Sequence, residues 1–401
     1  MYDSAPTIRD PREFVIGSRS STAAPIPFNR TSITNGERTA ISDALARGHL
    51  SGDGLFTKQC HLLLEQQLGV PKALLTTSCT HALEMAAMLL DLEPGDEVII
   101  PSFTFVSSAN AFVLRGARPV FIDIRPDTLN LDEGQLEQLI SSRTKAVVPV
   151  HYAGIACEMD TICDVARRHG VAVIEDNAHG LFGRYRNRLL GTFGCLATQS
   201  FHETKNFSCG EGGALLINDP KFAERAEILR EKGTDRSRFF RGMVDKYTWV
   251  DIGSSYLPSE ILAAMLYAQL ERRAEIQAKR ERVWRNYFEW LSPWAERSGT
   301  RLPIVPVHCE QTYHMFYMLL PTPAERDALI NYLKARAIQS VFHYLPLNRS
   351  DGSRRSGAAD TACPVTEDVS ERLLRLPFFT DLAEDDQQAV VESIEGFSAG
   401  T

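Results

Sequence analysis

Residues 146–176 read AVVPVHYAGIACEMDTICDVARRHGVAVIED. An apolar run at 146–150 precedes a helical pattern at 159–168, and a second apolar run follows at 171–175. Two strands joined by a helix in this way pair in parallel through a right-handed crossover. The stretch therefore predicts a parallel sheet covered by helices, with the acidic pair Glu175–Asp176 where one strand ends.

The same alternation of strand and helix patterns continues through the chain to about residue 220. Further strands are expected at 73–76, 97–100 and 119–123, and further helices at 80–90, 107–114 and 133–140. Ligands of open α/β sheets bind at the carboxyl ends of the parallel strands. Candidate functional residues are therefore sought directly after these strands.

The pattern of apolar residues changes near residue 258. Residues 259–291 read as one long helix that links two domains, and short strands are expected at 315–319 and 340–342. The polar insert at 350–357 is expected to be a mobile loop. The predicted organisation is a flexible N-terminal arm at 1–25, a large domain at 26–258, and the linking helix with a small α+β domain at 259–401.

The composition is that of a globular protein and disfavours several classes of partner. Of 401 residues, 44% are hydrophobic and 23% are charged, as in ordinary soluble domains. The formal net charge of -8 offers no basic surface to a nucleic acid, and no apolar run approaches the roughly 20 residues that cross a membrane. The eight cysteines lack C-x-x-C spacing and no signal peptide is evident, so we expect a cytoplasmic protein with reduced thiols and no metal site.

The first candidate site follows the strand at 73–76, where residues 76–83 read TTSCTHAL. Ser78, Cys79 and Thr80 stand at the expected start of a helix, whose free N–H groups and positive dipole end attract anions. Serine and threonine are also ordinary helix caps. The motif is therefore either a phosphate cradle or a simple N-cap.

The second candidate is Asp176, at the carboxyl end of the strand at 171–175. A carboxylate in this place can keep a heterocyclic nitrogen protonated, as pyridoxal phosphate requires because its ring accepts electrons well only when charged. A helix-capping aspartate or a metal ligand would occupy the same kind of position. The strand end by itself does not separate these interpretations.

The third candidate is Lys205, within the run SFHETKN at 200–206 and shortly before GEGG at 210–213. A lone lysine among polar residues is usually a solvated surface charge. A lysine that forms a Schiff base must instead be partly desolvated and close to other positive charge, so that its amine loses a proton. The neighbouring glycines favour this second interpretation because they let the backbone approach a flat cofactor.

The fourth candidate is PSFTFVS at 101–107, which follows the strand at 97–100. Phe103 and Phe105 each offer an aromatic face on which a pyridine ring can stack. Each is equally well explained by packing in the core. The spacing alone does not decide between the two roles.

Taken together, these motifs resemble the DegT/StrS family of nucleotide-sugar aminotransferases, within the fold-type-I group of pyridoxal-phosphate enzymes. The resemblance covers about residues 26–390, and its most specific parts are SFHETKN, GEGG and the Glu175–Asp176 pair. Within the family, the chain is most similar to the branch that aminates dTDP-4-keto-6-deoxyglucose at C4. The stretches shared with that branch are 52–54, 149–154, 231–234, 244–249, 253–257 and 342–344.

The resemblance implies a mostly parallel seven-stranded sheet, a large domain that binds pyridoxal 5'-phosphate, and a role for each matching residue. Lys205 is implied to bond covalently to the cofactor aldehyde and then to move protons, while Asp176 pairs with the pyridine nitrogen. The other implied contacts are Ser78, Cys79, Thr80 and Ser200 at the phosphate, Phe105 on the ring face and His179 near the ring hydroxyl. Phe103 is then assigned to the core, and His202 to a structural role.

Three positions depart from the pattern of many relatives. Cys79 stands where glycine is common, and His179 where glutamine is common. Ser255 stands where an asparagine reaches the phosphate of the neighbouring subunit's cofactor, and it is assigned to cofactor binding on that basis.

The implied activity is transfer of an amino group from L-glutamate to C4 of dTDP-4-keto-6-deoxy-D-glucose, in a homodimer whose subunits share active sites. The alternatives are an enzyme that aminates C3 and a non-catalytic scaffold or regulator that binds the cofactor. Dehydratases of the same fold replace the lysine with histidine, so Lys205 disfavours them. Lys205 and Asp176 together also argue against a scaffold without catalysis.

Overall fold

The computed structural model describes residues 24–397 of the chain. Its centre is a seven-stranded sheet in which only β9 runs against its neighbours β1 and β8, while the pairs from β8 to β3 are parallel. The predicted mostly parallel seven-stranded sheet is therefore confirmed. In spatial order, the strands are β1 (Lys72–Thr76), β9 (Gly213–Ile217), β8 (Leu196–Ser200), β5 (Ala172–Asp176), β4 (Thr144–Val147), β2 (Glu97–Pro101) and β3 (Arg118–Ile122).

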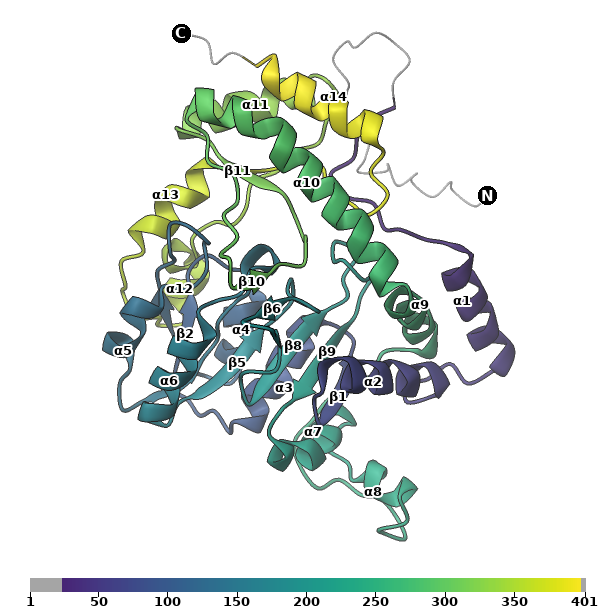
Figure 1. The fold of residues 1–401 in the computed structure, drawn as a ribbon. Helices are drawn as coiled ribbons and strands as arrows, with labels where there is room; N and C mark the ends of the chain where they lie inside the picture. The colour runs from purple at the N-terminus through teal and green to yellow at the C-terminus, as the bar shows by residue number, and fades with distance from the viewer. Residues whose placement is uncertain (1–23, 398–401) are drawn as a thin grey trace, which may run out of the picture.

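Helices cover both faces of this sheet, because consecutive apolar side chains of a strand point to opposite faces and both faces must be buried. Val98 and Ile100 pack with α3 (Cys79–Leu89) on one face, whereas Ile99 packs with α6 (Met159–His169) on the other. Near the β1 edge, α2 (Leu55–Leu68) and α9 (Glu260–Glu271) lie side by side (Figure 1). Their apolar side chains form a third cluster. The remaining helices of this part of the chain are α1 (Asn35–Arg47), α4 (Ser107–Val113), α5 (Leu136–Leu139), α7 (Ala223–Arg230) and α8 (Arg236–Phe240), the last of which lies away from the sheet (Figure 1).

The prediction of one long helix at 259–291 is wrong, because this segment forms two helices. α9 (Glu260–Glu271) and α10 (Arg273–Ser298) meet at Arg272, which has φ -87° and ψ 11° and leaves the helical region. α9 packs beside α1 and α2, whereas α10 joins the C-terminal apolar cluster (Figure 1). No glycine or proline marks Arg272, so the apolar pattern appears continuous through the break.

The mobile loop predicted at 350–357 is also wrong. The segment contains the helix α12 (Asp351–Arg355), whose N-cap Ser350 accepts a hydrogen bond from the Ser353 N–H at 3.1 Å. Serine, aspartate and glycine favour turns, but the same residues also begin helices. The strand predicted at 340–342 is reduced to a single bridge between Val341 and Arg375.

The C-terminal part packs its own apolar cluster around α10, and α11 (Pro323–Lys334) and α14 (Glu384–Glu395) lie above the sheet in Figure 1. Ile26 joins this cluster and bridges to Ile338. The predicted arm at 1–25 lies almost wholly outside the described residues, and the proposed domain boundaries stay a prediction. The elements here are β11 (Tyr317–Leu319), α11 (Pro323–Lys334), α13 (Pro364–Arg372), β12 (Leu373–Arg375) and α14 (Glu384–Glu395), and β6 (Arg184–Tyr185), β7 (Arg188–Leu189) and β10 (Cys309–Glu310) form a small separate sheet.

Across residues 24–397, no helix combines the length and the apolar character needed to cross a membrane.

Candidate active site

The predicted carboxylate lies at the carboxyl edge of the sheet, as the last residue of β5. Asp176 is buried, and its Oδ2 accepts a hydrogen bond from the Ser108 hydroxyl at 2.6 Å. Its Oδ1 accepts from the Ala178 N–H at 3.2 Å, and Ser108 is itself bonded to Thr104 at 2.9 Å. These donors suit an ionised carboxylate held in one orientation.

Glu175, the other member of the acidic pair, points to the opposite side of the strand and is structural. Its buried carboxylate accepts hydrogen bonds from the N–H groups of Gly191, Phe193 and Gly194, at 2.8, 2.6 and 2.8 Å. His151 Nε2 lies 3.0 Å from the same carboxylate. Glu175 therefore fixes the loop before β8, and Asp176 alone faces the candidate site.

Lys205 lies in the turn after β8, where its N–H donates to the His202 carbonyl at 2.9 Å. Surrounding protein excludes water from the amine and lowers its pKa to about 8; Cys79 and Asp176 oppose this shift, and Arg375 adds to it. At that pKa roughly a tenth of the amine is unprotonated at pH 7. The structure thus provides the desolvated lysine that Schiff-base chemistry requires.

The segment at 78–80 begins α3 at the same edge. Ser78 is the N-cap, accepting from the His81 N–H at 3.1 Å, so the simple capping role is confirmed. The Thr80 hydroxyl lies 2.7 Å from that of Ser107 on α4. Burial raises the pKa of the Cys79 thiol, which is therefore neutral. The free N–H groups of this helix start suit a phosphate, which remains a prediction.

The position of Gly213 in the structure explains why the last residue of the GEGG run is a glycine. It is the first residue of β9 and lies against the start of α3, where an added Cβ would be 2.3 Å from the Ser78 carbonyl carbon. Any larger residue would push the helix start away from the strand. The glycine therefore allows strand and helix start to meet at the site.

His179 is buried beside Lys205 in a group of three histidines. Its ring stacks on that of His314, with centroids 4.1 Å apart, and its centroid is 6.5 Å from that of His343. Burial, together with the charge of Lys205, lowers the pKa of His179 well below its usual value. Its Nδ1 is buried without a hydrogen-bond partner in the described part of the chain. A neutral imidazole with one unused nitrogen fits a polar ligand atom there.

The two phenylalanines at 101–107 differ in exposure. Phe103 is 1% exposed and packs against Tyr152 at 5.1 Å between ring centroids, so its core role is confirmed. Phe105 is 57% exposed, with its ring centroid 6.3 Å from that of Tyr344. Its face is available to a ligand, and the stacking role stays a prediction.

The remaining predicted residues lie around this edge. Ser200 ends β8, and its hydroxyl lies 3.5 Å from the His202 N–H. The His202 ring accepts from the Thr204 N–H at 3.3 Å, which agrees with a structural role in the turn. Ser255 is exposed next to Tyr256, whose carbonyl accepts from the Thr77 N–H at 2.9 Å.

Several site residues were missed by the motif analysis. Ser108 lies one residue beyond the 101–107 motif, and His343 lies in a stretch that was quoted only for its resemblance. Its Nδ1 is 3.0 Å from the Tyr152 hydroxyl, another residue of a quoted stretch. His314 and Arg375 come from the C-terminal part and carry no local pattern that marks a site.

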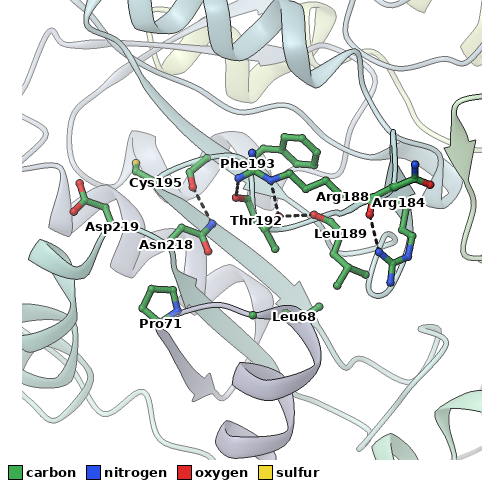
Figure 2. A pocket seen from close by; sticks show the side chains of 13 residues that line it. Leu68, Pro71, Arg184, Arg188, Leu189, Thr192, Phe193, Cys195, Asn218 and Asp219 are labelled. Atoms are coloured by element: carbon green, nitrogen blue, oxygen red, sulfur yellow. Dashed lines mark hydrogen bonds between the residues drawn. The ribbon is translucent and has the colours of Figure 1, made fainter.

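A larger cleft, of about 720 Å³, lies at the opposite edge of the sheet (Figure 2). Pro71, Cys195 and Asn218 line it, and they stand immediately before β1, before β8 and after β9. The Asn218 amide donates to the carbonyls of Gly191 and Gly194 at 3.0 and 2.8 Å. We place the candidate active site at the carboxyl edge despite its smaller space, because the Lys205 amine, the Asp176 carboxylate and the unpartnered His179 Nδ1 are there.

These residues fit pyridoxal phosphate. The amine of Lys205, the fixed Asp176 carboxylate, the start of α3 and the unused His179 nitrogen meet at one edge of a mostly parallel sheet. This combination defines a pyridoxal-phosphate enzyme of fold type I. The chain belongs to the DegT/DnrJ/EryC1/StrS aminotransferase family, whose profile matches residues 31–395.

Solved structures agree with this assignment. The chain is similar to the aminotransferase TlmJ from Streptoalloteichus hindustanus, with 30% identity, a TM-score of 0.85, and coverage of 92% of this chain and 98% of that one. A putative sugar aminotransferase from Streptococcus pneumoniae, solved in a PLP form, is 26% identical with a TM-score of 0.84, and 93% of this chain and 98% of that one are covered. The aminotransferase PseC from Helicobacter pylori, involved in pseudoaminic acid biosynthesis, is 25% identical with a TM-score of 0.83, and 92% and 98% are covered.

The chain is therefore a pyridoxal-phosphate-dependent aminotransferase of the sugar aminotransferase family. The predicted fold, cofactor and enzyme class are confirmed by the family match and by these structures.

Proposed function

We propose that the enzyme transfers the amino group of L-glutamate to C4 of dTDP-4-keto-6-deoxy-D-glucose. The observation that carries amino transfer is the desolvated Lys205 amine, with its pKa lowered to about 8, at the edge where Asp176 is held. Bound pyridoxal phosphate supplies an electron sink for both halves of such a reaction. The choice of C4 and of the dTDP sugar is supported by the shared sequence stretches, two of which contribute Tyr152 and His343 to the site.

The residues of this chain divide the work as follows. Asp176 would keep the proton on the cofactor's pyridine nitrogen, and the Ser108 hydroxyl holds Asp176 in place. Ser78, Cys79, Thr80 and Ser200 would hold the phosphate, Phe105 would cover one face of the ring, and His179 would sit near the ring hydroxyl. The Lys205 amine would bind the cofactor covalently and carry the proton between substrate carbon and cofactor.

We further propose that the enzyme is a homodimer with shared active sites. Figure 1 shows α8 and the following segment extending away from the body of the subunit. This extension exposes large apolar side chains that include Phe240, Met243, Tyr247 and Trp249, the last of which is 78% exposed. A second subunit covering them would place Ser255, a few residues further on, near the neighbouring cofactor.

The cytoplasmic location is a proposal as well. All eight cysteines are free, and several are deeply buried with a thiol pKa raised by burial, such as Cys60 and Cys157. Free thiols are typical of a reducing compartment.

The decisive test is incubation of the purified enzyme with pyridoxal phosphate, L-glutamate and dTDP-4-keto-6-deoxy-D-glucose, followed by NMR of the product. An amino group at C4 is expected. A parallel reaction with a 3-keto isomer of the sugar nucleotide tests the C3 alternative. Cofactor binding without conversion of glutamate to 2-oxoglutarate would instead indicate the scaffold.

A further inference from the structure

Residues 312–314 of the C-terminal part contact both loops that carry predicted cofactor residues. The Thr312 hydroxyl donates to the carbonyl of His179 at 2.6 Å. The Thr312 carbonyl accepts from the Nδ2 of Asn206, the residue after Lys205, at 2.7 Å. This short segment therefore bonds to the loop after β5 and to the turn after β8, and it brings the His314 side chain between them.

The hydrogen bonds of Asn206 define which nitrogen of His314 carries the proton. The Asn206 Nδ2 donates to the Thr312 carbonyl and to the Oε1 of Gln277 on α10, at 2.7 and 3.0 Å. Because a backbone carbonyl can only accept, the amide has one orientation, in which its Oδ1 faces His314 Nδ1 at 2.9 Å. An amide oxygen also only accepts, so the proton of the neutral His314 ring is on Nδ1.

The His314 ring, fixed in this way, is stacked on the ring of His179. The two centroids are 4.1 Å apart, and the ring planes are inclined by 17°. Burial lowers the pKa of each histidine well below its usual value, and the charge of Lys205 acts in the same direction on both. Two neutral flat rings pack favourably in this arrangement, whereas two imidazolium rings would repel each other. The stack therefore restricts the plane of the His179 imidazole.

His179 has little else to orient it. Its ring nitrogens form no hydrogen bond within residues 24–397, and its Nδ1 is buried. The other rings near it are more distant, with centroids at 6.1 Å for Tyr152 and 6.5 Å for His343. A buried imidazole without hydrogen bonds can turn about its side-chain torsions unless packing prevents it. The ring of His314 is the nearest aromatic group that provides such packing.

We propose that His314 is a positioning residue that holds the imidazole of His179 in the orientation suited to the ring hydroxyl of the cofactor. Asn206 supports this role, because its hydrogen bond prevents the His314 ring from turning. The inference rests on the proposed function, in which His179 lies near that hydroxyl, and adds to it the two residues that orient His179.

The test measures the lysine-bound cofactor rather than turnover. An imidazole N–H that donates to the ring oxygen stabilises the negative form of this oxygen and weakens its hold on a neighbouring proton. Loss of the orientation of His179 should therefore raise the pH midpoint at which the absorbance of the lysine-bound cofactor changes. For His314→Ala, the expected rise is about 0.5 to 1 pH unit.

A double-mutant cycle shows whether His314 acts through His179. His179→Ala alone should raise the midpoint at least as much as His314→Ala does. Adding His314→Ala to His179→Ala should then move the midpoint by less than about 0.2 pH unit, because the residue that His314 orients is already absent. His308→Ala is the matched control: His308 Nε2 lies 2.8 Å from Glu158 Oε1 instead, and its loss should leave the midpoint unchanged.

The neighbours of His179 exclude a simple effect of charge. The charged and titratable groups that face it are Lys205, His314, His343, Tyr152 and Arg375. His314→Ala removes a neutral ring from this set, so it removes no charge. His314→Phe keeps a flat ring against His179, and its midpoint should stay within about 0.2 pH unit of wild type.

Should His314→Ala fail to fold or to hold the cofactor, Asn206→Leu takes its place. This variant keeps the imidazole of His314 but removes the acceptor that fixes it. A smaller rise of about 0.3 pH unit is expected, and it should disappear when His179→Ala is also present. Thermal unfolding of each variant checks that it is folded.

The inference is overturned if His314→Ala, or Asn206→Leu in its place, holds the cofactor with an unchanged midpoint. It is also overturned if the shift is equally large when His179 is alanine, or if His314→Phe shifts the midpoint as far as His314→Ala does. A wild-type enzyme that shows no absorbance of lysine-bound cofactor would refute the proposed function, and that result is read independently of any His314 variant.

Discussion

The two edges of the central sheet differ in how they satisfy their polar groups. The amino edge contains the larger cleft, but its polar side chains bond to nearby carbonyls. The Asn218 amide donates to the Gly191 and Gly194 carbonyls, and the Thr192 hydroxyl donates to the Leu189 carbonyl at 2.7 Å (Figure 2). The carboxyl edge has less space but leaves the Nδ1 of His179 and the Nε of Arg375 without partners. These atoms lie at the same edge as the desolvated Lys205 amine, and this combination indicates the candidate site better than volume does.

The largest expected effect comes from Lys205→Ala. Loss of the amine removes both the covalent bond to the cofactor and the proton carrier, so the amination rate should fall by about 10,000-fold or more. The rate is measured by release of 2-oxoglutarate, with thermal unfolding as the control for folding. Turnover near the wild-type rate would refute the site at the carboxyl edge.

Asp176→Asn should have the next largest effect. The amide keeps the shape and the hydrogen bond from Ser108 but no longer stabilises a charged pyridine nitrogen, so kcat should fall by about 100- to 1,000-fold. The matched control is Asp219→Asn, since Asp219 lines the cleft at the other edge. Equal effects of the two substitutions would remove the distinction between the edges.

The pH dependence of the rate at which the cofactor binds to Lys205 tests the desolvation of the amine at the carboxyl edge. Because the pKa of Lys205 is lowered to about 8, the rate at which cofactor-free enzyme binds pyridoxal phosphate should rise about tenfold per pH unit below pH 8 and level off above it. Burial destabilises the protonated amine, so this group's contribution to stability becomes more favourable as pH rises from about 8 to about 10.4. Absorbance of the lysine-bound cofactor measures the rate, and a rise that continues steeply to pH 10 would contradict the lowered pKa.

Glu175→Gln tests whether the carboxylate next to Asp176 has a structural role only. In the wild type, three backbone N–H groups donate to the Glu175 carboxylate. The glutamine of the variant places an NH₂ group against these donors, so the free energy of unfolding should fall by about 2–4 kcal/mol. Urea unfolding monitored by circular dichroism measures this change. Activity per folded molecule should fall only a few-fold, and a loss as large as that of Asp176→Asn would assign Glu175 to the chemistry.

Arg184→Leu should have the smallest effect, with kcat and KM within about twofold of wild type. Arg184 is partly exposed, and its Nη1 donates to the Asn187 carbonyl at 2.7 Å on the surface. Steady-state kinetics with both substrates checks this expectation. A large change in KM for the sugar nucleotide would show that the cleft takes part in substrate binding.

Much of the fold and the cofactor side of the site could be predicted from the sequence because each signal is local. β-Branched runs bury both faces of a parallel strand, and the residues after them reach the carboxyl edge. His314 and Arg375 could not be found in this way, since they arrive from more than a hundred residues away in sequence. Within its run of leucines, Arg375 resembles an ordinary solvated side chain.

The misjudged segments also have a physical reason. Arg272 separates α9 from α10 without a helix-breaking residue, and its guanidinium bonds to the carboxylates of Glu37 and Glu275. The contact with Glu37 is long-range in sequence and has no counterpart in the local pattern. At 350–357, the same residue types favour both a turn and a helix start, and only the Ser350 cap resolves the choice.

The adjacency of Glu175 and Asp176 restricts how β5 can change over time. A substitution elsewhere in the strand leaves both carboxylates on their own sides, but inserting or deleting one residue would exchange them. Glu175 would then face the candidate cofactor site, and Asp176 would be buried under the loop before β8. Insertions and deletions in variants of this enzyme should therefore fall outside β5, because a change of one residue in the length of this strand would misplace both carboxylates.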